Sequence, residues 1–268
     1  MSVQTYQNDP AFKSAFLAEI GQHEQADALI KGDYGQMNGH FKGCAIGCSV
    51  FSLYRLQGKS AKAAAIQPMD HAKVAKDLGW PLWLAYMEDT LFERLPNDLS
   101  KTWPRRLAEA VPVGAVIDDT VLAKILVWSL TAERFGAVHA TNDAERKRWI
   151  TTIAEAITAD AAGTITADQR EAAARAARAA WAACDARAAW AAWDAWDARA
   201  AWAAWDAWAA RAAWDARAAR AAWAAWAAWA AWDARDAWDA WDARTRGAFY
   251  PALSEYALSV LRDLPVKP

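Results

Sequence analysis

The sequence contains few cysteines and no excess of positive charge. Cys44, Cys48 and Cys184 are its only cysteines, a sparse and odd number that suits a reducing compartment better than a disulfide framework. Lysine and arginine total 30 against 32 aspartate and glutamate residues, for a formal net charge of -2. Because a protein that holds duplex DNA through its phosphates is expected to be basic, we expect no duplex DNA partner.

Signals for export and for membrane insertion are also missing. The first residues, MSVQTYQNDPAF, have neither a basic start nor an apolar segment. No stretch reaches about 18 consecutive apolar residues once Asp and Arg are counted. We therefore expect a cytoplasmic protein without a membrane partner.

Familiar catalytic and phosphate-binding motifs are absent as well. The chain has no phosphate loop and no GxGxxG, GxSxG or HExxH pattern. The sequence therefore indicates no cofactor and favours a protein that is not an enzyme. The acidic residues Glu88, Asp89 and Glu93 are expected on the solvated edge of a helix.

One group of residues leaves an enzymatic alternative open. Cys44 and Cys48 form a CxxxC pair, and His71 follows in the sequence. These residue types suit zinc, but structural zinc sites generally use two compact ligand pairs, so buried thiols are favoured over a metal site. A thiol nucleophile with His71 as its base remains the alternative, since such partners are distant in sequence and close in space.

Helix patterns occupy the first 165 residues. Asp9 and Pro10 suit a helix start, and the apolar spacing continues towards Gly32. A glycine-rich loop is then expected to lead into a short buried segment around residues 50–56. No run alternates like a half-buried strand, which predicts an all-α N-terminal domain over residues 1–165. Further helices are predicted at about 70–78, 81–94, 98–110, 119–134 and 141–160.

The chain then changes character. Thr166 and Gln169 have capping-box spacing, and a three-residue repeat, (Ala or Asp)-Ala-(Trp or Arg), follows over residues 172–244. We assign residues 166–246 to the repeat segment and residues 247–268 to a C-terminal amphipathic helix. Of the 19 Trp residues in the chain, 14 lie in this repeat, and all 14 share one phase.

A period of three does not match an α-helix. With about 3.6 residues per turn, the Trp position drifts about 60° per triplet and circles the helix, and supercoiling cannot correct so large a mismatch. Two geometries remain open: an unusually long 3₁₀ helix, or α-helical segments surrounded by neighbours. Alanine favours the α-helix, whereas the period favours 3₁₀.

Two interpretations of the repeat follow. In a structural scaffold, Trp fills the core while Asp and Arg face solvent. In a ligand platform, indoles stack on flat rings and Arg contacts phosphates. The residues predicted to bind a ligand in the second case are Trp190, Trp193, Trp196, Arg199, Trp202, Trp205, Trp208 and Arg211.

Residues 36–117 resemble a family of bacteriophage and prophage proteins. The resemblance rests on the strings GHFKGCAIGC, MDHAKVAKDLGWPLWLAYMEDTLFERLPND and TWPRRLAEAVPVGA, and the family's Ala-rich, Trp-containing tail is also present. Phe41, Trp80 and Arg94 depart from the family pattern. The resemblance assigns no chemical role to the matching positions, which are Gly43, Cys44, Gly47, Cys48, His71, Gly79, Pro81, Leu84, Glu88, Asp89, Phe92, Pro96, Trp103, Pro104, Pro112 and Gly114.

The resemblance implies a phage accessory protein in the cytoplasm of a bacterial host. Together with the Trp and Arg repeat, it suggests a counter-defence protein that sequesters a nucleotide-like signal, or one that binds a host defence protein. A homo-oligomer is expected. The alternatives are a structural or protein-interaction scaffold whose Trp residues are core, and a Cys- and His-dependent enzyme.

Overall fold

The computed structural model describes residues 4–33, 35–38, 40–59, 70–139, 142–176 and 243–266. These residues are mostly helical, with one small two-stranded sheet. The chain divides into two compact units: residues 1–121 with 250–268, and residues 122–249. No helix in the described ranges is both long enough and apolar enough to span a membrane.

The first unit begins with a left-handed turn, η1 (Thr5–Asn8), in which Tyr6, Gln7 and Asn8 all have positive φ values. The buried Tyr6 hydroxyl donates a hydrogen bond to the Ala108 carbonyl oxygen at 2.6 Å. Helix α1 (Pro10–Gln25) follows. The Asp9 side chain accepts a hydrogen bond from the Ala11 amide at 2.8 Å, so the predicted N-cap is confirmed.

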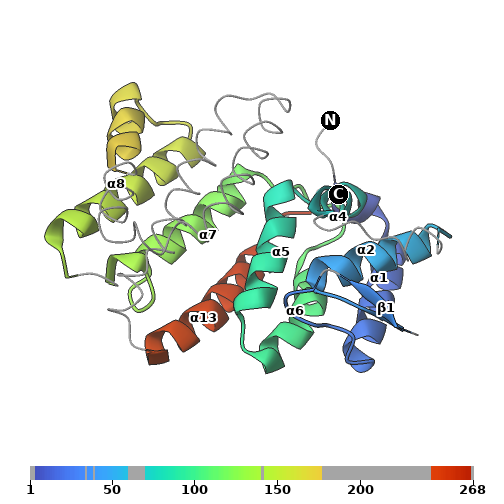
Figure 1. The fold of residues 1–268 in the computed structure, drawn as a ribbon. Coiled ribbons are helices and arrows are strands. Elements are labelled where there is room, and N and C mark those ends of the chain that lie inside the picture. The colour runs from blue at the N-terminus through green and yellow to red at the C-terminus, as the bar shows by residue number, and fades with distance from the viewer. Residues whose placement is uncertain are drawn as a thin grey trace. The chain divides into compact units, whose positions relative to one another are not determined.

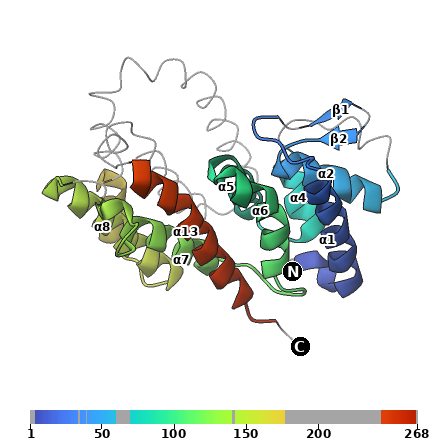
Figure 2. The same ribbon diagram turned by 90° about the horizontal axis from the view of Figure 1, so that it is seen from below.

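Two short strands correct the all-α prediction. Strand β1 (Gln36–Asn38) pairs antiparallel with β2 (His40–Lys42), and Figure 2 shows both beside α2. Phe41 explains the position of β2, because its ring stacks on Phe51 of α2 at 4.4 Å between centroids. Three-residue strands are too short to show an alternating pattern, so the sequence contains no signal for them.

Helix α2 (Ala45–Leu56) begins earlier than the buried segment predicted at 50–56. The predicted glycine-rich loop therefore extends too far along the chain, because its last residues belong to α2. Cys44 is the N-cap, and its sulfur accepts a hydrogen bond from the Gly47 amide at 3.5 Å. The residues of α2 from Ala45 to Val50 are all buried, because this helix lies between α1, α4 and α5.

Three helices complete the centre of this unit: α4 (His71–Leu78), α5 (Leu82–Arg94) and α6 (Asn97–Ala110). Figure 1 shows α5 near α4 and α6, and it packs against both. Gly79, with φ +67°, ends α4, and Pro81 precedes α5. The predicted helices at 70–78, 81–94 and 98–110 agree with these elements, since their Gly, Pro and Asn boundaries act locally.

Distant parts of the chain close the first unit. The Thr5 amide donates to the Ala115 carbonyl oxygen at 3.0 Å, and Ala115 also forms an antiparallel bridge with Val266. Helix α13 (Ala243–Arg262) contributes buried residues from its second half, and the Arg106 guanidinium contacts the Glu255 carboxylate at 2.6 Å. Pro251 lies inside α13. The buried residues of this half include Leu253, Ala257, Leu258 and Leu261.

The second unit contains most of α7 (Asp119–Thr131), the 3₁₀ helix η2 (Ala137–His139), α8 (Ala144–Ala161) and a helix over residues 167–176. Thr166 and Gln169 exchange hydrogen bonds of 2.8 and 3.2 Å, which confirms the capping box. The core of this unit is formed by Ala123, Leu126, Leu130, Ala137, Ile153, Ala154, Ile157 and Ala176.

Helix lengths differ from prediction at several ends. Helix α1 ends at Gln25 instead of continuing towards Gly32, because residues 28–30 lie beside Gly43, to which the Ile30 amide donates a hydrogen bond at 2.9 Å. Helix α13 begins at Ala243 instead of at the predicted residue 247, and it ends at Arg262. The domain boundaries predicted at residues 165 and 246 stay a prediction.

Candidate functional site

The ligand-binding residues predicted in the repeat lie outside the described residues. They are Trp190, Trp193, Trp196, Arg199, Trp202, Trp205, Trp208 and Arg211. The same holds for the choice between α and 3₁₀ geometry beyond residue 176. Chemistry in the described part of the chain is concentrated in the first unit, where α2, α4 and α5 meet.

The first turn of α2 places both predicted thiols in the protein interior. Cys44 and Cys48 are buried and not joined in a disulfide. The Cys48 thiol lies 3.5 Å from the Gly43 carbonyl oxygen and 3.9 Å from that of Ala28. Ala28 follows α1 and Gly43 directly precedes the start of α2, so the Cys48 thiol connects α2 with both of these segments.

Burial keeps these thiols protonated. It raises the pKa of Cys44 to about 12, and the carboxylate of Asp89 adds to the shift. Burial also raises the pKa of Cys48, with a further contribution from Cys44. The thiolate is the nucleophile and the metal ligand, so this environment opposes both roles. Within the described residues, no three His, Cys, Asp or Glu side chains are placed to hold a metal ion.

His71 has a partner that the sequence did not indicate. Its Nε2 lies 3.1 Å from Asp89 Oδ2, and its ring stacks on Tyr86 at 4.3 Å between centroids. The sequence offered His71 as the base for a cysteine, but the described contacts pair it with a carboxylate on α5. Asp89 lies on the face of α5 that meets α4, and only that packing brings the pair together.

Glu88 corrects the prediction of a solvated helix edge. The residue is 1 % exposed, and its Oε1 accepts a hydrogen bond from the Ser49 hydroxyl at 3.0 Å. The Trp103 indole donates to the Glu88 backbone oxygen at 3.0 Å. Burial raises the pKa of Glu88 to about 8, although the Ser49 hydrogen bond partly opposes the shift. A carboxyl group placed in this way is neutral at neutral pH.

Glu93 fixes the loop that precedes β1. Both of its carboxylate oxygens accept a hydrogen bond from the Gly32 amide, at 3.0 and 3.2 Å. Partial burial raises the pKa of Glu93 despite this hydrogen bond. Glu88, Asp89 and Glu93 therefore join α5 to three different neighbours: α2, α4 and the loop.

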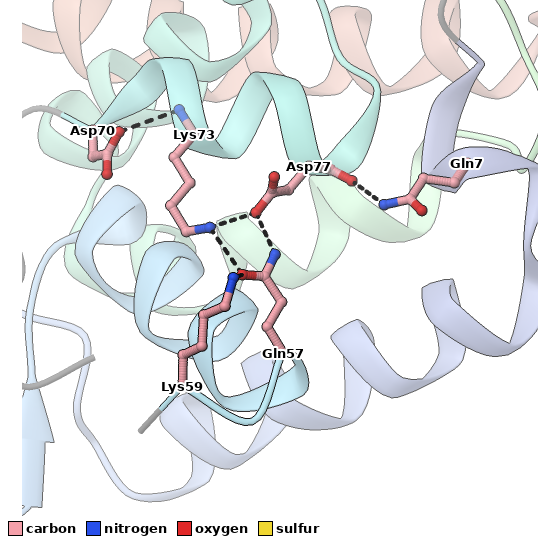
Figure 3. A network of polar contacts seen from close by, with 6 residues as sticks. All are labelled: Gln7, Gln57, Lys59, Asp70, Lys73 and Asp77. Carbon is pink, nitrogen blue, oxygen red and sulfur yellow. Dashed lines mark hydrogen bonds and ion pairs between the residues drawn. The ribbon is translucent and has the colours of Figure 1, made fainter. Parts of the chain in front are cut away.

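A polar network holds α4 in place (Figure 3). Lys73 Nζ lies 2.5 Å from Asp77 Oδ2, which also accepts a hydrogen bond from the Gln57 amide at 2.8 Å. Gln7 donates to the Asp77 backbone oxygen at 3.2 Å, and Asp70 caps the helix through the Lys73 amide. This network connects α4 with the end of α2 and with η1, so it positions His71 at the start of α4.

The arrangement as a whole is one of internal hydrogen bonds between helices. The sequence signal that was missed is the position of Glu88 and Asp89 in the apolar α5, where Leu84, Leu91 and Phe92 are buried. A helix with such a buried surface brings some of its polar residues inside.

In comparisons with known proteins, no family model, no curated sequence and no solved structure matches this chain.

Proposed function

We propose that this chain is a binding protein of the bacteriophage accessory type, not an enzyme, whose repeat sequesters a small aromatic or nucleotide-like ligand. The observation that carries the proposal is the composition of the repeat: 14 Trp residues share one phase with Arg over residues 172–244. Indole faces stack on bases, and guanidinium groups contact phosphates.

The environment of the cysteines and of His71 supports this proposal over the enzymatic alternative. The thiols are buried with raised pKa values, and His71 Nε2 is engaged by Asp89. A thiol nucleophile needs a lowered pKa and an adjacent base. The hydrogen bonds of Cys44 and Cys48 instead hold the start of α2, and the contact of His71 connects α4 with α5.

The first test measures ligand capture by the full chain. The protein is incubated with lysate of phage-challenged cells, purified and denatured, and the released molecules are identified by mass spectrometry. ATP serves as a defined probe in calorimetric titration. A nucleotide bound in stoichiometric amount would support capture, whereas a protein that releases nothing and does not bind ATP would argue for a scaffold.

A double variant tests the role of the repeat arginines. We expect Arg199→Ala with Arg211→Ala to weaken binding at least about tenfold, in line with the loss of charge-assisted contacts of about 1.5–3 kcal/mol. The matched control is Arg106→Ala with Arg146→Ala, which removes two arginines outside the repeat. Unchanged affinity in the first pair, with an unchanged circular-dichroism spectrum, would remove these arginines from the site.

The scaffold is a second candidate, favoured by the start of the repeat. Ala173 and Ala176 are buried, and Arg175 forms an ion pair with Glu171 on the same helix. Here alanine packs in the core and arginine is paired with an acid, as expected of a structural repeat.

If the rest of the repeat is structural in the same way and Trp205 is a core residue, Trp205→Ala should cost about 3–5 kcal/mol of unfolding free energy, typical of a large core truncation. A neutral Trp205→Ala variant that retains ligand would count against the scaffold.

A further inference from the structure

Glu88 is an acid inside the first unit, and no cation among the described residues is paired with it. Its side chain is 1 % exposed, and among the described residues its Oε1 is bonded to Ser49 while its Oε2 has no hydrogen-bond partner. A carboxylate buried without a positive partner is strongly destabilised. The neutral acid is much less costly to bury, because it carries no net charge.

In the part of the chain that the structure describes, the groups around Glu88 supply no positive charge to it. The electrostatic influences on it and from it involve Asp89 on its own helix, the Cys48 thiol of α2 and the Tyr6 phenol of η1. From α6, the Trp103 indole bonds only the Glu88 backbone oxygen. On α4, the titratable side chain facing α5 is His71, and its Nε2 contacts Asp89. Each of these neighbours is neutral, acidic or already engaged.

We propose that α2 and α5 are held together through Glu88 in its protonated form, so that the first unit loosens as the proton is lost in mildly alkaline solution. The Ser49 hydroxyl donates to Oε1 in both protonation states. Loss of the proton places a negative charge between the helices beside Asp89, which is a like-charge contact. The folded chain therefore holds one proton at Glu88 that the unfolded chain gives up.

The sign of the pH dependence follows from the two states. The pKa of Glu88 is about 8 in the folded chain against 4.5 as its ordinary value. Between these values the folded state binds more protons than the unfolded state, so the stability falls as pH rises. A difference of one proton corresponds to about a tenfold change in the unfolding constant per pH unit. Below pH 4.5 and above about pH 8, Glu88 adds no further slope.

The titration of His23 limits the pH range in which the effect of Glu88 on stability can be observed. Burial lowers the pKa of His23 from 6.5 to about 4, so the folded chain loses stability as pH falls through that range. The two effects oppose each other between pH 4.5 and 6.5. The net loss of stability from these two groups therefore appears between pH 6.5 and about 8.

The test compares urea unfolding of the full chain and of Glu88→Gln from pH 5 to pH 9. Gln keeps an acceptor for Ser49 and cannot ionise. The unfolding constant of the unsubstituted chain, divided by that of Glu88→Gln, should therefore rise about tenfold per pH unit up to about pH 8 and then level off. Glu109→Gln, at an exposed residue, is the control and should give a constant ratio. A constant ratio for Glu88→Gln as well would overturn the proposal.

A second measurement covers failure of Glu88→Gln to fold. Infrared difference spectroscopy of folded Glu93→Gln, which removes the other acid with a raised pKa on α5, should show a protonated carboxyl band at pH 6 that disappears with a midpoint near pH 8. Adding Ser49→Ala should move this midpoint upward, because the Ser49 hydrogen bond lowers the pKa of Glu88. A spectrum without that band at pH 6 would also overturn the proposal.

Discussion

Single buried side chains account for much of the chemistry of the first unit. Cys44, Cys48, His71 and Glu88 are each at most 2 % exposed, and each has a hydrogen-bond partner on a neighbouring segment or turn. Buried polar groups are costly unless they are bonded, so the pairs Glu88–Ser49 and His71–Asp89 also favour the correct packing of α5 against α2 and α4. Substitutions at these residues should therefore change the stability of the fold and the exposure of its buried side chains, and not a catalytic activity.

The thiols offer a direct prediction at this scale. In the folded protein at pH 8, iodoacetamide should modify Cys44 at least about a thousandfold more slowly than in urea, because its pKa is about 12 rather than 9 and fewer thiolates form. Peptide mapping by mass spectrometry separates Cys44 and Cys48 from Cys184. Rapid labelling of Cys44 in the native protein would contradict the buried environment.

The pair formed by His71 and Asp89 gives a second prediction. Asp89→Asn should lower the unfolding free energy by about 1–3 kcal/mol, because a buried imidazole nitrogen loses its carboxylate partner. Urea denaturation measures the loss. Asp98→Asn, at an exposed residue of α6, should change the stability by no more than about 0.5 kcal/mol. Equal effects of the two substitutions would mean that the pair contributes nothing specific.

At the scale of elements, the first unit is closed by the left-handed turn η1. A Cβ atom on Gly79 would lie 2.2 Å from the Gln4 backbone oxygen, and one on Gly114 would lie 2.3 Å from Asn8 Oδ1. Both glycines also have positive φ values. The Gln4 backbone, directly before η1, and the Asn8 side chain therefore each approach a glycine that lies far away in sequence.

A pair of glycine variants tests this contact. Gly79→Ala should cost about 2–5 kcal/mol, since the added methyl group meets backbone and the left-handed conformation is unfavourable for alanine. Gly21→Ala lies inside α1 with nothing within 4 Å of its Cβ, so it should gain about 0.5–1 kcal/mol. Thermal or urea unfolding compares them; a loss at both positions would mean that helix propensity is not the deciding term at Gly21.

Helix ends were predictable where the signal is a local one. The Asp9 cap, the capping box of Thr166 and Gln169, and the stop at Gly79 each depend on residues within about one turn of each other. The strands β1 and β2 were not predictable in this way. Their pairing is accompanied by the stacking of Phe41 on Phe51, a contact between a strand and a helix.

At the scale of the whole molecule, the stability of the fold depends on pH through its buried titratable residues. His23 lies against Phe41 and Phe51, with ring centroids at 5.9 and 5.5 Å, and burial lowers its pKa to about 4. A neutral buried histidine stabilises the fold fully above its ordinary pKa of 6.5, and the contribution is lost as pH falls towards 4.

Replacement of His23 should make this contribution visible. Between pH 6.5 and pH 4, the chain should lose up to about 3 kcal/mol of unfolding free energy relative to His23→Gln, which has no proton to gain. Urea unfolding at several pH values gives the difference curve. If the two curves run parallel across this range, the imidazole is not held neutral by its surroundings.

The sequence by itself determined the helical character of the chain, several helix boundaries and the phase of the Trp repeat, because propensity, capping and periodicity depend on near neighbours. Only the tertiary structure decided that Glu88 is buried, that His71 meets Asp89 rather than a cysteine, and that the thiols are shielded. These outcomes depend on which face of α5 meets α2 and α4. That choice is made by packing between segments far apart in sequence, and no local pattern contains it.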